Sequence, residues 1–296
     1  MRGMNGTVAL FLALENNHEH VALELLEHDC DIDVRFNARN DAINAKFVDG
    51  RTPLIFAADK GFDRVVRKLI HMGQDVNLQN SGGRTALQEA IHGKHVSTAQ
   101  ILLEESDPNI ELSDNECWTP LLQCADQGMW QIAKMLIERG ANLEARSSET
   151  NIWGWRKFMK ATALLIALES PHTEMVKVLC EAGADVNVQN VDHEMPIHMA
   201  VRVGNLGMVK AVMARGVDPN VYTLRMETPL MVAIAKEHVE IVECLVNNYP
   251  ECKDFEFENQ YGPKEMAESK ARVPGVNVAV RLAMQGLVNG SLGKGW

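Results

Sequence analysis

The side chains with the greatest capacity for chemistry in this chain are its six cysteines and ten histidines. A structural zinc site needs thiolate or imidazole ligands at short, regular spacing, about two to four residues apart. Cys117 and Cys124 are seven residues apart, and a His193/His198 pair lacks further ligands. The spacing predicts no metal centre. We expect the cysteines to be reduced thiols of an intracellular protein.

Acidic side chains offer no catalytic arrangement either. Asp75 and Asp185 occupy the same place in two related segments, 75–77 and 185–187, which both read DVN. Short polar side chains satisfy backbone groups at tight turns, so these residues are interpreted as structural. The chain has no Gly-rich phosphate loop, HExxH motif or nucleophile elbow. The sequence therefore predicts neither an enzyme nor a cofactor.

An aromatic and basic segment at 146–161 is the remaining chemical feature. Trp153, Trp155 and Phe158 interleave with Arg156 and two lysines. Such a mixture can stack on nucleic acid. The net charge of −11 argues against that partner, because phosphate binding needs a basic surface. Two readings stay open: the rings fold back onto the scaffold, or they contact a partner protein.

A repeated segment must position these residues. Its copies start at 52, 85, 119, 162, 195 and 228, at intervals of 33, 34, 43, 33 and 33 residues. Each start is followed by an apolar residue and, three positions later, a small one: Leu54/Ala57, Leu87/Ala90, Leu121/Cys124, Leu164/Ala167, Ile197/Ala200 and Leu230/Ala233. One copy cannot bury its apolar face alone, so the copies must stack.

In its period and its Thr-Pro-Leu-x-x-Ala pattern, the chain resembles the ankyrin-repeat family. The resemblance implies an all-α solenoid with short β-hairpins, in which each repeat adds a hairpin and two antiparallel helices. It implies a stack of about eight units, six clear and two divergent caps, with two long inter-repeat hairpin insertions. It also implies partner binding rather than catalysis, and a structural role for His198.

On this reading, residues 1–285 form a single ankyrin-repeat domain and residues 286–296 a flexible tail. The insertions lie at about 35–46 and 146–160. The apolar run 8–14 is read as the first helix of a repeat rather than a secretory signal. The missing first hairpin fits either a terminal cap or a truncated longer protein. The expected repeats lie near 1–34, 47–77, 80–111, 114–144, 157–187, 190–220, 223–253 and 256–285.

Candidate partner-binding residues are those at predicted hairpin tips, at loop positions and in the second insertion. They are Arg84, His92, Trp118, Asp126, Gln127, Trp153, Trp155, Arg156, Phe158, Glu169, Glu194, Arg202, Arg225 and Glu227. Trp118 is read either as packed on a neighbouring hairpin or as an exposed anchor, which interfaces favour. Trp130 is expected to be half-buried scaffold. The family resemblance also implies hydroxylation as a modification at Asn77 and Asn187.

The sequence thus predicts a non-catalytic protein–protein interaction module. It would bind through hairpin tips, the short helices of a concave face and the finger 151–160. The alternative is a scaffold or adaptor segment of a larger protein, for example one that recruits substrates to a ubiquitin ligase or a signalling enzyme. We expect another protein as the partner, no nucleic acid, no membrane span, a monomer, and a location in the cytoplasm or nucleus.

Overall fold

The structure is a computed structural model that describes residues 2–27, 49–148, 160–170, 172–254 and 262–271. The chain separates into two compact units, residues 1–150 and 151–296, and each is described by itself. Several sequence predictions lie wholly or partly outside the described residues: most of both insertions, much of the last expected repeat at 256–285, and the tail at 286–296.

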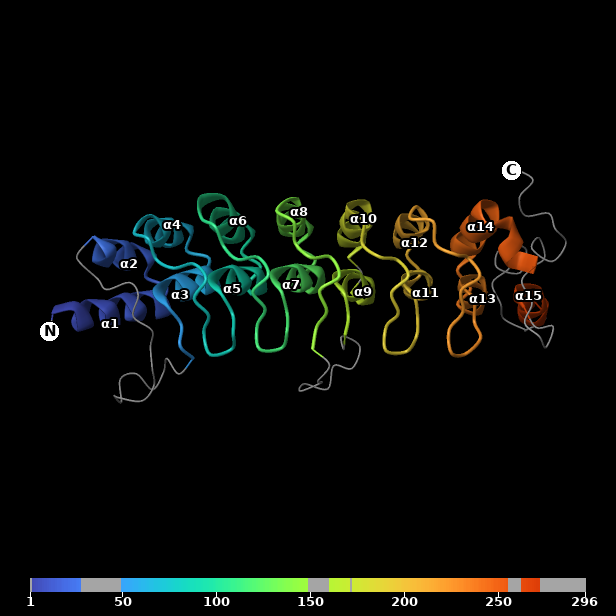
Figure 1. The fold of residues 1–296 in the computed structure, drawn as a ribbon, viewed down its shortest axis with the longest axis horizontal. Helices are drawn as coiled ribbons and strands as arrows, with labels where there is room; N and C mark the ends of the chain where they lie inside the picture. The colour runs from blue at the N-terminus through green and yellow to red at the C-terminus, as the bar shows by residue number, and fades with distance from the viewer. Residues whose placement is uncertain (1, 28–48, 149–159, 171, 255–261, 272–296) are drawn as a thin grey trace. The chain divides into compact units, whose positions relative to one another are not determined.

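The first unit consists of paired helices in two rows. Figure 1 shows one row formed by α1 (Arg2–Glu15), α3 (Pro53–Lys60), α5 (Ala86–His92) and α7 (Pro120–Gln127). The other row holds α2 (Glu19–Leu26), α4 (Asp63–His71), α6 (Val96–Glu105) and α8 (Trp130–Glu138). Each helix packs on its neighbour in the row and on its partner across the rows.

The second unit repeats this arrangement. One row contains α9 (Ala163–Glu169), α11 (Pro196–Val203), α13 (Pro229–Ala235) and α15 (Pro263–Ala271). The other contains α10 (Thr173–Ala182), α12 (Leu206–Met213) and α14 (Val239–Asn248), and the short 3-10 helix η3 (Pro250–Asp254) follows α14. Helix α15 lies within the segment 256–285, where the last divergent repeat is expected.

The predicted repeat starts are N-caps, because each has an extended backbone and immediately precedes a helix: α3, α5, α7, α9, α11 or α13. The hydroxyl of Thr52 accepts the Ile55 N–H, and Thr228 accepts that of Met231. Such a bond satisfies one of the donors that a helix start leaves open. All twelve residues of the predicted apolar/small pairs have at most 2% of their surface exposed.

A left-handed backbone position precedes every one of these starts by two residues. It has φ between 52° and 68° at Gly50, Cys117, Lys160, His193 and Met226, and φ of 77° at Gly83. The intervals are again 33, 34, 43, 33 and 33 residues. The same turn thus returns the chain to the helix in each copy, although only two copies place a glycine there.

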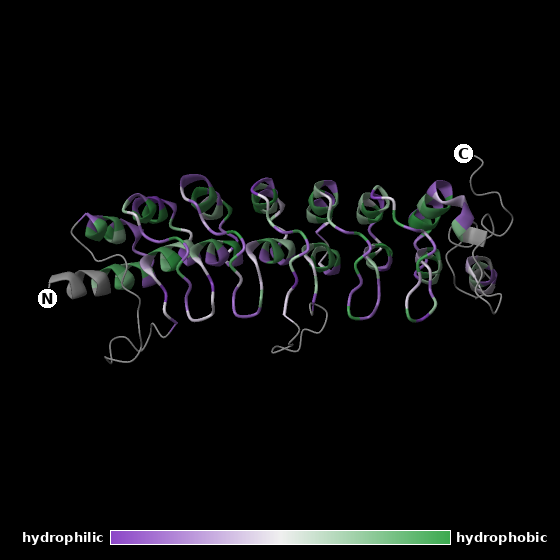
Figure 2. Ribbon diagram, in the orientation of Figure 1, coloured by the Kyte–Doolittle hydropathy of each residue, from purple (hydrophilic) through white to green (hydrophobic). Residues whose placement is uncertain are grey.

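The segments that join successive helix pairs contain turns, and no strand occurs among the described residues. The expectation of short β-hairpins is therefore not confirmed, and these segments are called tip loops below. Figure 2 shows hydrophobic residues gathered in the helices of each unit, whereas the loops carry many of the hydrophilic ones. Within the described ranges, no helix is long and apolar enough to cross a membrane.

Candidate functional site: the tip loops of the first unit

A side-chain oxygen at the first position shapes the tip loops 80–84 and 114–118. In the loop 80–84, Asn80 Oδ1 accepts the N–H groups of Gly82 and Arg84 at 3.0 and 2.9 Å. In the loop 114–118, Asp114 Oδ1 accepts those of Glu116 and Trp118 at 3.0 and 2.9 Å. A short polar side chain that holds two backbone donors makes a tight, closed loop.

Backbone hydrogen bonds join neighbouring tip loops of the first unit. Ser81 N–H donates to the carbonyl of Asp49, and Asn115 N–H donates to that of Gly82. Ser148 N–H donates in the same way to Glu116. These bonds join four successive segments, at residues 49, 80–84, 114–118 and 148, so the side chains of the two complete loops form a preorganised surface.

Gly83 permits this close approach. Its backbone has φ of 77°, and a Cβ built there would lie 2.8 Å from the backbone nitrogen of Asn115. That distance is shorter than a van der Waals contact, and although the Asn115 side chain, whose Oδ1 would lie 2.6 Å away, could move, the backbone of Asp114 and Asn115 is an obstacle as well. Glycine is therefore needed at this position both for its conformation and for its size.

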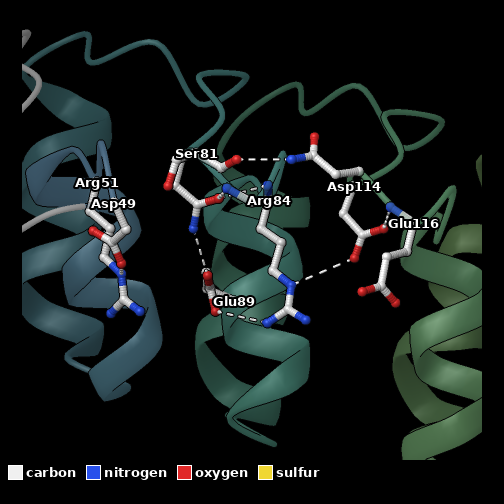
Figure 3. A pocket seen from close by; sticks show the side chains of 10 residues that line it. Asp49, Arg51, Ser81, Arg84, Glu89, Asp114 and Glu116 are labelled. Atoms are coloured by element: carbon white, nitrogen blue, oxygen red, sulfur yellow. Dashed lines mark hydrogen bonds and ion pairs between the residues drawn. The ribbon is translucent and has the colours of Figure 1, made fainter. Parts of the chain in front are cut away.

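The tip loops and helix α5 enclose a polar cleft of about 360 Å³. We call it the tip cleft. It is lined by residues 49 and 51, by parts of the loops 80–84 and 114–118, and by Glu89 on α5. Figure 3 shows Arg84 in its middle, with its guanidinium pointing between Glu89 and Asp114.

Arg51 stands at one side of the cleft. Its Nε lies 2.6 Å from Asp49 Oδ2, its guanidinium donates to Asp59 at 2.9 Å, and its Cζ lies 5.6 Å from the centre of the Phe56 ring. Burial lowers the pKa of Arg51, but the carboxylates of Asp49, Asp59 and Glu89 outweigh it and leave the pKa raised. Arg51 is thus a fixed, always charged wall of the cleft.

Arg84 is held more loosely. Its Nε lies 3.6 Å from Asp114 Oδ2, and one terminal nitrogen lies 3.9 Å from Glu89 Oε2. The Arg84 side chain is 34% exposed, while those of Glu89 and Asp114 are 4% and 6% exposed. The guanidinium therefore balances two nearly buried carboxylates without a hydrogen bond to either oxygen.

The second unit carries an ion cluster at the repeat positions that Arg51 and Asp59 occupy in the first unit, but with the acidic and basic residues exchanged. Arg202 donates to Glu169 at 2.8 Å and to Glu194 at 3.2 Å. Glu194 immediately precedes a repeat start, as Arg51 does, and Arg202 follows that start by seven positions, as Asp59 does. Burial lowers the pKa of Arg202, but Glu194 and Glu169 outweigh it and raise the pKa.

The tip loop 223–227 is the apolar one. Tyr222, Leu224 and Met226 are 53%, 71% and 48% exposed. Among the residues that the structure describes, no backbone hydrogen bond joins this loop to the loop 190–194. The sequence reading named Arg225 and Glu227 here and missed the three apolar residues, although their alternation with polar residues was a usable signal.

The structure brings together only some of the predicted site residues. Arg84 lies in the tip cleft, and Trp118 closes the loop beside it, half-buried, with its carbonyl accepting from Gln88 at 2.7 Å. Glu169, Glu194 and Arg202 form the cluster of the second unit. The others are partly or fully exposed on helix ends and loops: His92, Asp126, Gln127, Arg225 and Glu227.

Asn77 and Asn187, the candidates for hydroxylation, stand in different surroundings. Asn77 Oδ1 accepts the N–H of Asn109 at 2.7 Å, whereas Asn187 is exposed. The backbone N–H of Asn77 donates to Asp75, and that of Asn187 donates to Asp185. The modification of both asparagines stays a prediction.

The remaining sequence readings meet the structure as follows. Trp153, Trp155, Arg156 and Phe158 lie outside the described residues. Trp130 opens α8 with 39% of its surface exposed. In the part of the chain that the structure describes, no group of His, Cys, Asp or Glu residues is arranged to hold a metal ion.

Comparison with known proteins bears on the fold and the repeat. The family model "Ankyrin repeats (3 copies)" matches residues 2–80, 54–147, 149–223 and 197–263. Rabankyrin-5 of Mus musculus is 31% identical over 201 residues, 66% of this chain and 16% of that protein. Potassium channel AKT2/3 of Arabidopsis thaliana is 30% identical over 148 residues, 49% of this chain and 16% of that protein.

A solved structure with a similar fold is the ankyrin repeat domain of Bcl-3. The TM-score is 0.60 at 23% identity, and the match covers 79% of this chain and 97% of that one. At this identity the likeness concerns the fold alone. The chain spans only 16% of the length of these two curated relatives, so their activities do not transfer to it.

Proposed function

Since the chain belongs to the ankyrin-repeat family, we propose that the tip loops of its first unit bind a partner protein. Ankyrin repeats are generally protein–protein interaction modules, and the family is typically non-catalytic. The observation that carries the proposal is the row of hydrogen bonds that joins the loops around the tip cleft. A surface that is ordered before binding loses less entropy when the partner arrives.

The finger 151–160 and the cluster of Glu169, Glu194 and Arg202 are proposed as further contact regions. Their support is the aromatic and basic composition of the finger and the partly exposed ion pairs of the cluster. We also keep the adaptor role, the monomeric state and the location in the cytoplasm or nucleus as proposals. The short share of each curated relative that the chain spans is compatible with an adaptor segment of a longer protein.

The test compares two bulky substitutions of equal charge change. Ser81 is exposed in the tip loop, and Gln131 is exposed on α8. Wild type, Ser81→Arg and Gln131→Arg are used to capture proteins from the source cells, and each captured protein is then purified and titrated against the three chains. A partner that loses at least tenfold in affinity for Ser81→Arg and keeps its affinity for Gln131→Arg supports the proposal.

Equal affinity of every purified partner for wild type and Ser81→Arg would overturn the assignment to the tip loops. Thermal unfolding of both variants shows whether the fold is retained. We expect it to be retained, because both altered side chains are exposed and exposed substitutions usually change the free energy of unfolding by less than about 0.5 kcal/mol.

A further inference from the structure

Two carboxylates of the tip cleft, Glu89 and Asp114, each hold a hydrogen bond on one oxygen and only a long ion pair on the other. Glu89 Oε1 accepts the side-chain N–H of Asn80 at 2.8 Å, and Asp114 Oδ1 accepts two backbone N–H groups. Their other oxygens, Oε2 and Oδ2, face Arg84 at 3.9 and 3.6 Å, which is beyond hydrogen-bond distance. Arg84 is loosely held between these two carboxylates, and Glu89 also acts on Arg51, which is shared with Asp49 and Asp59.

The charge of a group that could bind in the tip cleft follows from this arrangement. The cleft is lined by four carboxylates and two guanidinium groups, and Arg51 is already engaged by Asp49 and Asp59. An anionic guest would compete with Glu89 and Asp114 for Arg84 and add negative charge to a cleft whose carboxylates already outnumber its guanidinium groups, which is unfavourable. A cationic guest supplies the missing charge and hydrogen-bond donors instead.

The geometry favours a guanidinium over an ammonium. The two open oxygens belong to different elements, Glu89 to helix α5 and Asp114 to the loop 114–118. A guanidinium presents five N–H donors in a planar fork and is weakly hydrated, whereas an ammonium is a compact, strongly hydrated charge. We propose that the tip cleft receives an arginine side chain of the partner polypeptide, an inference that rests on the proposed function.

The probe is the peptide acetyl-Gly-Arg-Gly-amide, titrated into the isotope-labelled full chain and followed by the backbone amide signals of Ser81 and Asn115. The same peptide with citrulline, which has the shape of arginine but no charge, is the first control. The same peptide with glutamate is the second. We expect saturable shifts with the arginine peptide that weaken with added salt, and none with either control.

Two substitutions remove one charge each and keep the internal hydrogen bonds. Glu89→Gln retains an oxygen for Asn80, and Asp114→Asn retains an oxygen for the two backbone donors. Glu104→Gln is the matched control, since Glu104 is exposed on α6 and the change in net charge is the same. We expect each cleft variant to bind the arginine peptide at least about threefold more weakly, in line with the size of partly exposed ion pairs, and Glu104→Gln to bind it unchanged.

Three results would overturn the inference: no shift with the arginine peptide, equal shifts with citrulline, or an equal loss for Glu104→Gln. Saturable shifts with the glutamate peptide would do so as well, because they would make Arg84 the anchor for an anion. The proposed function is tested separately, by the Ser81→Arg variant. If the arginine peptide does not bind but Ser81→Arg still loses the purified partner, the tip loops bind that partner through other contacts.

Discussion

Replacing His198 by glutamine is expected to remove a pH dependence while keeping the local structure. His198 is fully buried; its Nδ1 accepts the Met195 N–H at 3.3 Å, and its Nε2 donates to the Val221 carbonyl at 3.2 Å. Gln88 makes the equivalent bonds in the first unit, because its oxygen accepts the Thr85 N–H at 3.0 Å and its nitrogen donates to a loop carbonyl at 2.7 Å. A glutamine at 198 can therefore take over both bonds.

The magnitude follows from the pKa of His198. Burial lowers this pKa to about 4, against the opposing effect of the backbone carbonyls of Val221 and Glu227. An exposed histidine in the unfolded chain has a pKa of about 6.5, so between these values the unfolded state binds more protons. Neutral His198 makes its whole contribution to the free energy of unfolding above pH 6.5, and this contribution falls as the pH drops toward 4. Between pH 7.5 and 5 the loss is about 2 kcal/mol.

Urea unfolding of wild type and His198→Gln at pH 7.5 and 5.0, followed by circular dichroism, measures this loss. Other titrating groups are common to both proteins, so the difference between their free energies of unfolding isolates His198. We expect wild type to lose about 2 kcal/mol more than the variant over this range. Equal pH dependence in the two proteins would refute the neutral, hydrogen-bonded role of the ring.

Three further predictions concern stability. Gly83→Ala should lower the free energy of unfolding by at least about 1 kcal/mol more than Gly73→Ala does, because both positions have positive φ but only the Cβ at 83 meets the next loop. Equal losses in urea unfolding would contradict the close packing of the loops. Thr228→Val should lower the free energy of unfolding by about 1 kcal/mol, because it removes the hydrogen bond that caps α13. Thr162→Val should lower it by almost nothing, because the Thr162 hydroxyl is buried without a hydrogen-bond partner. Similar losses in calorimetry would show that Thr162 also caps its helix. Leu224→Ser should change the free energy of unfolding by less than about 0.5 kcal/mol because the side chain is 71% exposed; a loss above about 1 kcal/mol in the same assay would mean that Leu224 supports the fold.

The helix starts and the core could be predicted from the sequence because they depend on local chemistry that repeats. Thr52 and Thr228 combine a capping hydroxyl with a following proline, and Leu54 and Ala57 recur at fixed offsets in every copy. The left-handed turn position could not be recognised by residue type. Gly83 suits it, but Lys160 and Met226 occupy it too, so only the register identifies it.

The tip cleft was only partly predictable. Arg84 was found from its place before a repeat start, and Arg51 stands at the same place and was open to the same argument. Glu89 occupies the position at which other copies place Phe56 or Ile166, so a carboxylate at a core position was a signal that went unused. Its partnership with Asp114 comes from loop packing, which no local pattern encodes.

The most direct test of the tip loops as the binding surface is chemical-shift mapping of the purified partner on the isotope-labelled chain. We expect the largest changes in the first unit to fall on the amides of residues 80–84 and 114–118 and on Glu89. Broad changes along α4, α6 and α8, with the tip loops unaffected, would contradict the account, because those helices form the opposite row of the unit.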